Sequence, residues 1–266
     1  MNNPKIFGFI PARMSASRFP GKPLYPICNM PMIQHVIHRA QMFNEWDGLY
    51  LTTCDQEIRE FGESIGIPVI MTSDKHTRAL DRVAEAATKC GQNIGDNDIV
   101  LNVQGDEPMM HPEMINATIK PMLDDENVKG TILAMKIVSE VQYYDPNTLK
   151  IINNRKGDIL YTSRSPIPYC EQFSPELGAR RIYGIFGFKW HFLKTFTNME
   201  ESPLELAESC DSNRLYDNGY TQRIAPYPYI ESFAVDVPED IVKVEKYMKN
   251  DPYWKKYKNK QNGSNK

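Results

Sequence analysis

The sequence predicts an α/β protein with a mainly parallel sheet and an inserted antiparallel lobe. In the first half, short β-rich runs alternate with amphipathic helical segments, the order typical of parallel strands covered by helices. From about residue 140 to 200, strand-like segments follow one another through links rich in turn residues and proline, which is typical of antiparallel pairs. We therefore expect one α/β core that carries a lobe of a different character.

The first half of the sequence predicts alternating strands and helices. Residues 6–10 form an apolar run that ends at Pro11, and Met32, Val36 and Ala40 lie on one face of a helix. The same patterns predict further strands over residues 49–53, 69–72, 98–103 and 131–138, and helices over 32–43, 56–65, 80–90 and 112–123. These segments build the parallel part of the predicted sheet.

The second half predicts the lobe and the end of the core. Strands are expected over residues 149–152, 159–162, 182–188 and 221–225, and helices over 204–216 and 238–249, the last with a proline at its start. Residues 1–250 are thus predicted to form a single domain with its inserted lobe at about 140–200. The polar, Lys/Asn-rich tail at 251–266 is predicted to be disordered.

Composition excludes several classes of partner. Thirty-one Lys and Arg residues against 34 Asp and Glu residues give a net charge of −3, too little positive charge for a nucleic-acid or membrane-surface protein. No stretch approaches the roughly 18 apolar residues of a membrane span. The first residues do not resemble a signal peptide, and five widely spaced cysteines do not suggest a disulfide framework. We expect a cytoplasmic protein.

The densest chemical signal is the loop that follows the first strand, PARMSASRFPGKPL at residues 11–24. Loops at the carboxyl ends of parallel strands are where α/β sheets bind ligands. Arg13, Arg18 and Lys22 are suited to a triphosphate, because guanidinium groups offer paired donors and lysine a point charge. Neither GxGxxG nor GxxxxGK[ST] is present, which excludes the dinucleotide and P-loop motifs. The alternative is a solvated basic loop.

Two acidic motifs complete the pattern. VQGDEP at residues 103–108 places Asp106 directly after a hydrophobic strand, where a carboxylate is well placed to ligate Mg²⁺. FAVDVPED at residues 233–240 contains Asp236, which by itself could simply cap the helix that begins near Pro238.

Together these three motifs resemble the 3-deoxy-manno-octulosonate (Kdo) cytidylyltransferase family, also called CMP-Kdo synthetases, of the nucleotide-diphospho-sugar transferase fold. The resemblance runs from about residue 6 to 249. It includes PMIQHV at 31–36, Ser163-Arg164 with Ile167-Pro168, GIFGF at 184–188 and SPLE at 202–205.

The resemblance implies a reaction in which CTP and an acidic sugar give a CMP-sugar and pyrophosphate. It implies catalytic roles for Arg13, Lys22 and Asp106, and a Mg²⁺ ion held by Asp106 and Asp236. The nucleotide-binding residues it implies are Pro11, Ala12, Arg13, Arg18, Lys22, Thr72 and Arg82. The acceptor-binding residues it implies are the positions of Gln104, Arg164, Phe186 and Asp211, with Arg164 facing the sugar carboxylate, and we add Arg78 to them as a candidate of this sequence's own. A homodimer formed through the 140–200 lobe is also expected.

The departures from the family pattern lie on the acceptor side. HQSGT[DE]R reads HTRALDR at residues 76–82, HLG[IV]Y[GA][YF] reads IYGIFGF at 182–188, and LEQLR reads CDSNR at 210–214. A histidine has become Ile182, a tyrosine has become Phe186, and Asp211 is one methylene shorter than the family's acid. Arg78 replaces a small residue, and it could contact a carboxylate or phosphate or simply be solvated. Unpaired buried polar groups cost about 1–3 kcal/mol each.

We therefore expect a cytidylyltransferase whose acceptor is a Kdo-like sugar acid or another small anion. Three alternatives stay open: an authentic Kdo enzyme, a nucleotidylyltransferase that uses another base or a phosphorylated acceptor, and a nucleotide-binding regulator without catalysis.

Overall fold

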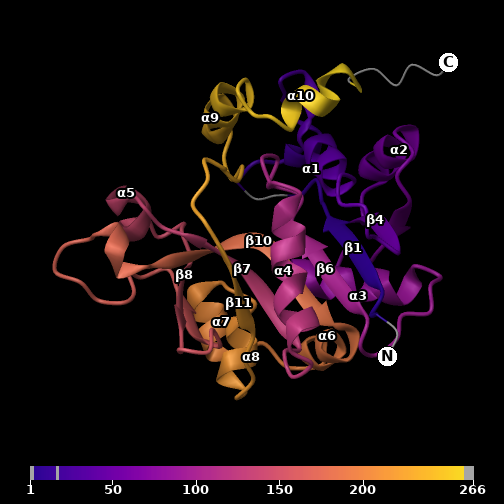
Figure 1. Ribbon diagram of the computed structural model, residues 1–266. Helices are drawn as coiled ribbons and strands as arrows, with labels where there is room; N and C mark the ends of the chain where they lie inside the picture. The colour runs from indigo at the N-terminus through magenta and orange to yellow at the C-terminus, as the bar shows by residue number, and fades with distance from the viewer. Residues whose placement is uncertain (1–2, 16–17, 261–266) are drawn as a thin grey trace. The chain divides into compact units, whose positions relative to one another are not determined.

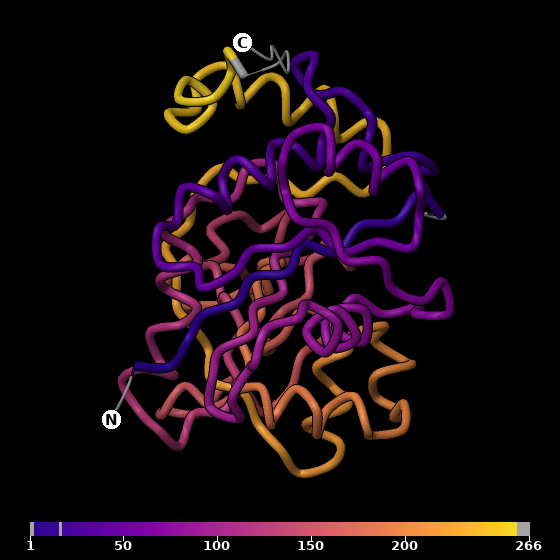
Figure 2. The backbone as a smooth tube through the Cα atoms, turned by 90° about the vertical axis from the view of Figure 1, so that its right-hand side faces the viewer, coloured from indigo at the N-terminus to yellow at the C-terminus, as the bar shows by residue number. Residues whose placement is uncertain are grey.

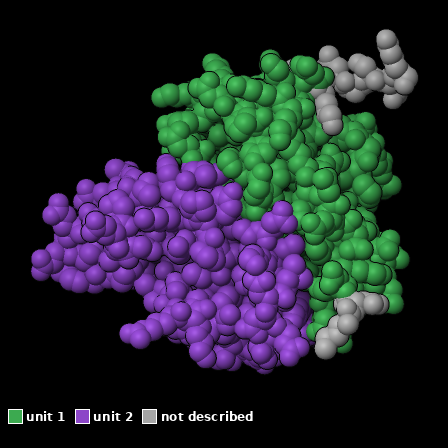
Figure 3. Space-filling model, in the orientation of Figure 1, with its two compact units in different colours: residues 1–115, 231–266 green, residues 116–230 purple. Residues whose placement is uncertain are grey.

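Parallel strands form the sheet of the first part of the chain, as its alternating pattern predicts. The structure is a computed structural model and describes residues 3–15 and 18–260. By its internal contacts the chain divides into two compact units, Met1–Ile115 with Glu231–Lys266, and Asn116–Ile230. Figure 3 colours them separately. The second unit is larger than the lobe predicted at 140–200.

The first unit carries four parallel strands in the order β6-β1-β4-β5. They are β1 (Ile6–Pro11), β4 (Gly48–Thr53), β5 (Val69–Met71) and β6 (Ile99–Val103). Phe9 on β1 stands in register with Tyr50 on one side and Asn102 on the other. Every residue of β6 is buried, as a central parallel strand requires. The carboxyl ends of β1 and β6 therefore lie next to each other.

Helices and a small hairpin complete this unit (Figure 1). The helices are α1 (Met32–Ala40), α2 (Gln56–Ser64), α3 (Ala79–Lys89), α9 (Glu239–Met248) and α10 (Trp254–Tyr257), with short 3-10 turns η1 (Lys22–Leu24) and η3 (Lys258–Lys260). The hairpin pairs β2 (Pro26–Ile27) with β3 (Met30–Pro31). Helix α3 contacts β1, β4, β5 and β6 through its apolar face.

The end of the chain corrects one expectation. Residues 251–260 belong to the tail predicted to be disordered, but α10 packs into a core cluster in which Trp254 and Tyr257 are buried beside Ile27 and Met32. Figure 2 shows this yellow segment beside the indigo segment that carries the hairpin. The aromatic residues outweigh the polarity of the surrounding lysines because they remove apolar area from water. Residues 261–266 of the predicted tail lie outside the described residues.

Within the second unit the strands follow one another in the order β11-β7-β10-β8-β9. They are β7 (Gly130–Lys136), β8 (Lys150–Asn153), β9 (Ile159–Ser163), β10 (Arg180–Lys189) and β11 (Arg223–Tyr227). All pairs are antiparallel except β11 with β7. The predicted antiparallel lobe is thus found within this unit.

The helices of the second unit differ from prediction in two places. They are α5 (Glu140–Tyr144), α6 (Trp190–Thr197), α7 (Pro203–Glu208) and α8 (Asn213–Asp217), with the 3-10 turn η2 (Pro175–Leu177), while α4 (Glu113–Asp124) spans the boundary between the units. The helix predicted over 204–216 is wrong, because Ser209 adopts a left-handed conformation (φ 50°) that ends α7 and separates it from α8. The sequence did not predict α5 and α6, because segments of five and eight residues are too short to show a clear period.

Among the described helices, none combines the length and the hydropathy that crossing a bilayer would require.

Candidate functional site

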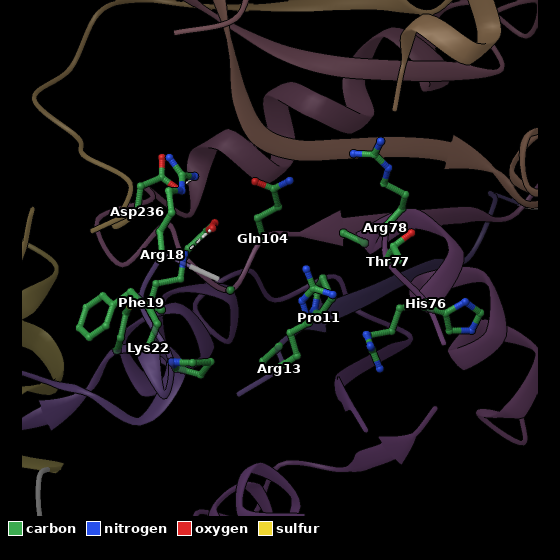
Figure 4. A pocket seen from close by; sticks show the side chains of 17 residues that line it. Pro11, Arg13, Arg18, Phe19, Lys22, His76, Thr77, Arg78, Gln104 and Asp236 are labelled. Carbon is green, nitrogen blue, oxygen red and sulfur yellow. Dashed lines mark hydrogen bonds and ion pairs between the residues drawn. The ribbon is translucent and has the colours of Figure 1, made fainter. Parts of the chain in front are cut away.

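A pocket of about 280 Å³ lies within the first unit, at the carboxyl ends of its parallel strands. Three chain segments and one distant residue form its wall (Figure 4). Lining residues are Pro11, Ala12, Arg13, Arg18, Phe19, Lys22, Pro23, Met32, His76, Thr77, Arg78, Ala79, Arg82, Gln104, Gly105, Asp106 and Asp236. The three motifs singled out in the sequence therefore meet at one place.

The basic loop is closed by its own backbone. The amide of Gly21 donates to the carbonyl of Met14 over 2.9 Å, and Gly21 adopts a φ of 75°, which favours glycine at the start of η1. The amide of Met14 also donates to Asp55 Oδ2 over 2.8 Å. Ala16 and Ser17 lie outside the described residues. These bonds fold the loop back so that Arg13, Arg18 and Lys22 all line the pocket.

Lys22 joins the loop to the two acidic motifs. Its Nζ donates to Asp106 Oδ2 over 3.0 Å and to the carbonyl of Val235 over 2.6 Å. The amide of Val235 in turn donates to the carbonyl of Asp106 over 3.0 Å. The Lys22 side chain is only 12% exposed, so its charge is poorly screened by water. One ammonium group thus connects three segments that are distant in the sequence.

Asp236 is an ion-pair partner and not a helix cap. Arg18 Nη2 lies 2.7 Å from Asp236 Oδ1, and Figure 4 shows the two side chains pointing toward each other. The turn before α9 is instead held by Asp240, whose Oδ2 accepts hydrogen bonds from the amides of Asp236 and Val237. The capping alternative for Asp236 is therefore wrong.

The two pocket carboxylates influence each other electrostatically. Burial and then the negative charge of Asp106 raise the pKa of Asp236, although Arg18 and Lys22 act against this. Asp106 Oδ1 is buried without a hydrogen-bond partner among the described residues. A raised carboxyl pKa and an unpartnered carboxylate oxygen both favour a bound cation. These side chains fit a Mg²⁺ ion, which takes one or two protein carboxylates together with substrate oxygens.

Within the part of the chain that the structure describes, no three or more His, Cys, Asp and Glu side chains are grouped as a metal site.

Gly105 allows the loop after β1 to approach the loop after β6. A Cβ atom at this position would lie 2.7 Å from the carbonyl oxygen of Pro11 and 2.8 Å from Ile33 Cδ1. Both contacts are shorter than van der Waals distance, and the first involves backbone that cannot turn aside. The glycine therefore sets how closely Pro11 and Gln104 can flank the pocket.

Arg82 provides a buried cation at another wall. Its Nη1 donates to Thr72 Oγ1 over 2.5 Å, and Thr72 is itself bonded to the carbonyl of Thr53 through its amide and its hydroxyl. Arg82 is only 3% exposed, yet its Nη2 has no hydrogen-bond partner among the described residues. Thr72 lies behind Arg82 and does not line the pocket itself. A buried donor without a partner costs free energy, which a ligand atom would recover.

The remaining predicted acceptor residues belong to the second unit. Arg164 donates through Nε to the carbonyl of Glu208 over 2.8 Å and through Nη1 to that of Pro146 over 2.9 Å. Phe186 on β10 is 8% exposed, and Asp211 lies between α7 and α8. The first-unit pocket brings together the other predicted site residues except Thr72.

Sequence reasoning missed several pocket residues. His76 and Thr77 line the pocket, but they belong to a segment singled out only for its departure from the family pattern. Phe19, Pro23 and Met32 contribute apolar wall, and the Val235 carbonyl binds Lys22. A backbone carbonyl leaves no signal in the sequence. In the sequence, only the position of Val235 within the motif 233–240 indicated that this residue lies near the basic loop.

A parallel α/β sheet that gathers three loop cations and two carboxylates at its carboxyl edge defines a nucleotidyltransferase. The cytidylyltransferase family profile matches residues 7–233. This chain belongs to the 3-deoxy-manno-octulosonate cytidylyltransferase family.

Named relatives support that assignment. The chain is 39% identical to the 3-deoxy-manno-octulosonate cytidylyltransferase of Thermodesulfovibrio yellowstonii, over 89% of this chain and 95% of that protein. It is 37% identical to the enzyme of the same name from Oleidesulfovibrio alaskensis, over 88% and 93%.

Solved structures agree with the fold. A CMP:2-keto-3-deoxy-manno-octonic acid synthetase complexed with CTP matches with a TM-score of 0.83 and 33% identity, over 92% of this chain and 99% of that one. The 4-diphosphocytidyl-2C-methyl-D-erythritol synthase of Anaerococcus prevotii matches with a TM-score of 0.60 at 14% identity, over 92% and 99%, and shows the fold alone. The predicted fold class is confirmed.

Proposed function

We propose that this protein transfers CMP from CTP to a Kdo-like sugar acid or a related small anionic acceptor and releases pyrophosphate. The observation that carries the proposal is the meeting of Arg13, Arg18 and Lys22 with Asp106 and Asp236 in one pocket. The relatives named for this activity, and the CTP complex of one of them, support the choice of nucleotide.

In the proposed reaction an acceptor oxygen attacks the α-phosphorus of CTP, and the bond from that phosphorus to the bridging oxygen of pyrophosphate breaks. Arg13, Arg18 and Lys22 bind the triphosphate and offset the charge that builds up on it. Pro11 and Ala12 border the nucleotide, and Thr72 holds Arg82 against it. Such transfers depend on positioning and charge stabilisation more than on covalent help from the protein.

Mg²⁺ is the proposed cofactor, held by Asp106 and Asp236. When bound, it would supply positive charge to the phosphate oxygens. Lys22 and Arg18, which pair with the two carboxylates in this structure, are then available to the triphosphate.

The proposed acceptor contacts are Arg78, Gln104, Arg164, Phe186 and Asp211. A hydroxyl is missing at Phe186 and an imidazole at Ile182 relative to the family pattern, so an acceptor that fits this chain would present fewer polar groups there. An authentic Kdo enzyme, or one acting on a phosphorylated acceptor, is the alternative.

We further propose a homodimer formed through residues 140–200 and a cytoplasmic location, where CTP is available. Light scattering on the purified protein tests the first. A monomer at micromolar concentration would contradict it.

The decisive experiment measures pyrophosphate release from the purified protein with Mg²⁺, an acceptor and each of the four nucleoside triphosphates. We expect turnover with CTP and only slow turnover when Kdo is the acceptor. A preference for UTP or ATP would overturn the nucleotide assignment. Turnover of Kdo at an ordinary enzymatic rate, about 1–10³ s⁻¹, would favour the authentic Kdo enzyme instead.

A further inference from the structure

The carboxylate of Glu85, outside the pocket, holds the segment that forms one of its walls. Glu85 lies on α3, and its Oε2 accepts hydrogen bonds from the amide of Ser73, over 2.9 Å, and from His76 Nε2. Its other oxygen, Oε1, accepts from Lys89 Nζ over 2.5 Å. One oxygen therefore faces the segment that precedes the helix, and the other bonds to a lysine on the helix itself.

No helix or strand hydrogen bonds hold that segment. Residues 72–78, all of them described, form neither helix nor strand between β5 and α3. A turn is made where Ser73 Oγ accepts a hydrogen bond from the amide of Lys75 over 3.2 Å. The following residues His76, Thr77 and Arg78 all line the pocket. Side-chain contacts therefore contribute to the position of the pocket wall that His76, Thr77 and Arg78 form.

The two ends of the wall are tied to each other and to β4. Thr72 is bonded to Thr53 on β4, and Arg82 on α3 is bonded to Thr72. Between these ends, Glu85 bonds to Ser73 and His76. A loop anchored at its ends still has freedom in the middle, and a partly buried charge-assisted bond restricts that freedom.

The charge state of Glu85 suits this task. Burial raises its pKa, but the hydrogen bonds from Lys89, from the Ser73 amide and from His76 outweigh burial and bring the pKa to about 2. Glu85 is therefore ionised at neutral pH. A charged acceptor makes stronger hydrogen bonds than a neutral one. The side chains of Glu85 and His76 are only 21% and 25% exposed, so the contact is partly shielded from water.

The geometry points to Glu85 as a positioning residue that acts through Ser73 and His76 to set the pocket wall formed by His76, Thr77 and Arg78. The inference rests on the proposed function, because that wall then faces the nucleotide and the acceptor. Glu85 does not line the pocket, so its effect on a ligand bound there is exerted through Ser73 and His76.

The test compares variants that remove the Glu85 carboxylate with variants that remove the partner of only one of its two oxygens. Glu85→Ala removes both sets of contacts, and His76→Ala removes the wall-facing side chain. Lys89→Ala is the matched control, since it removes the partner of Oε1 and leaves the bonds to the wall. Glu63→Ala removes a comparable exposed ion pair on α2. Each variant is assayed for CTP binding by calorimetry, for kcat and KM, and for amide hydrogen exchange over residues 72–79.

We expect Glu85→Ala to raise the Kd and KM for CTP about tenfold, in line with the loss of hydrogen bonds to a charged group, while kcat changes less than about twofold. Exchange over 72–79 becomes faster with or without CTP. Lys89→Ala and Glu63→Ala leave all of these values at the wild-type level. In the double variant Glu85→Ala/His76→Ala, the effects on Kd are less than additive, because both changes break one contact.

An unchanged Kd and KM in Glu85→Ala would overturn the inference, whether or not exchange is faster. A fall in kcat with KM unchanged, together with a lower melting temperature, would assign Glu85 a purely structural role and would also overturn it. A wild-type chain that neither binds nor turns over CTP refutes the proposed function instead, a result visible without any variant.

Discussion

Lys22 and Asp106, 84 positions apart in the sequence, form an ion pair in which Nζ lies 3.0 Å from Oδ2. The same ammonium group bonds to the Val235 carbonyl, next to Asp236. Arg18 and Lys22 of the loop therefore pair with the carboxylates of the other two motifs. Charges of both signs kept this close remain partly desolvated and ready for a charged ligand.

Replacement of Asp106 by Asn should abolish turnover and leave the fold intact. The amide keeps the size of the side chain but loses the charge that would hold Mg²⁺, and we expect kcat to fall roughly 10³-fold or more. Pyrophosphate release measures the effect, and circular dichroism checks the fold. Asp124→Asn, an exposed ion-pair partner of Lys120 on α4, is the control and should retain full activity. Activity surviving in Asp106→Asn would mean that the metal role is misassigned.

Replacement of Asp236 by Asn should cost activity but not stability. Because burial and Asp106 raise the pKa of Asp236, the folded protein binds this proton more tightly than the unfolded chain does. Stability from this group is thus present at low pH and lost as the pH rises through the raised pKa. At pH 7 the ionised carboxyl opposes folding, and the exposed partner Arg18 compensates little. Urea unfolding at pH 7 should show the variant at least as stable as the wild type. A clearly lower free energy of unfolding would contradict this account.

Gly105→Ala should disturb both the fold and the pocket. The added methyl group would stand 2.7 Å from the Pro11 carbonyl oxygen, so the loop after β1 must move. We expect a loss of about 1–3 kcal/mol in the free energy of unfolding, together with weaker CTP binding. Denaturant unfolding and calorimetry measure the two effects. Gly95→Ala, in an exposed turn, serves for comparison, and equal behaviour of the two variants would refute the close approach.

Tyr257→Phe should destabilise the protein through a buried hydrogen-bond chain. Arg39 Nε donates to Tyr257 Oη over 3.0 Å, and this hydroxyl is also 2.9 Å from His35 Nδ1. The His35 Nε2 atom contacts the Ile27 carbonyl, so it carries the proton and Nδ1 accepts from the tyrosine. Removing the hydroxyl leaves a buried donor and a buried acceptor without partners, at a cost of about 1–3 kcal/mol.

Thermal and urea unfolding measure the loss in Tyr257→Phe. Tyr253→Phe is the control, since its hydroxyl bonds to Glu113 at the exposed surface and its removal should matter little. Equal stability of both variants would show that α10 contributes nothing through this chain of bonds.

His35 should make stability fall in mild acid. Burial is the main cause that lowers its pKa from 6.5 to about 4, and the nearby charge of Arg39 adds to it. The unfolded chain therefore binds a proton that the folded protein excludes, and stability is complete above pH 6.5 and lost as the pH falls toward 4. The full effect is on the order of 3 kcal/mol.

Urea unfolding at pH 7 and pH 5 tests the role of His35. The wild type should lose more stability on acidification than His35→Gln, whose side chain does not titrate. If both proteins lose the same amount, His35 is not the group responsible.

Local pattern was sufficient for much of the fold. The runs 6–10 and 98–103 became β1 and β6, because an apolar stretch this short, bounded by turn signals, fits a buried strand better than a helix. The break at Ser209 was not predictable, since a serine in the left-handed conformation has no compositional signature. The sequence did contain a signal for α10: Tyr253, Trp254 and Tyr257 are spaced so that they lie on one side of a helix, although lysines surround them.

The candidate site, too, was predictable from the sequence only in part. The three motifs located the cations and carboxylates, because phosphate and Mg²⁺ chemistry requires those residue types and the ends of parallel strands bring them to one edge. Asp236 stayed ambiguous in the sequence, since a carboxylate before a helix is equally suited to capping. Only its contact with Arg18 decided between the two.

By itself, the sequence determined the α/β class, the family and the three motifs, all of which depend on residues that are neighbours along the chain. The tertiary structure decided which distant groups meet: Lys22 with Asp106, Arg18 with Asp236, and Tyr257 with Arg39. The physical reason is that strand and helix preferences act over a few residues. Pairings across the fold depend on how the packed elements bring side chains within hydrogen-bond distance.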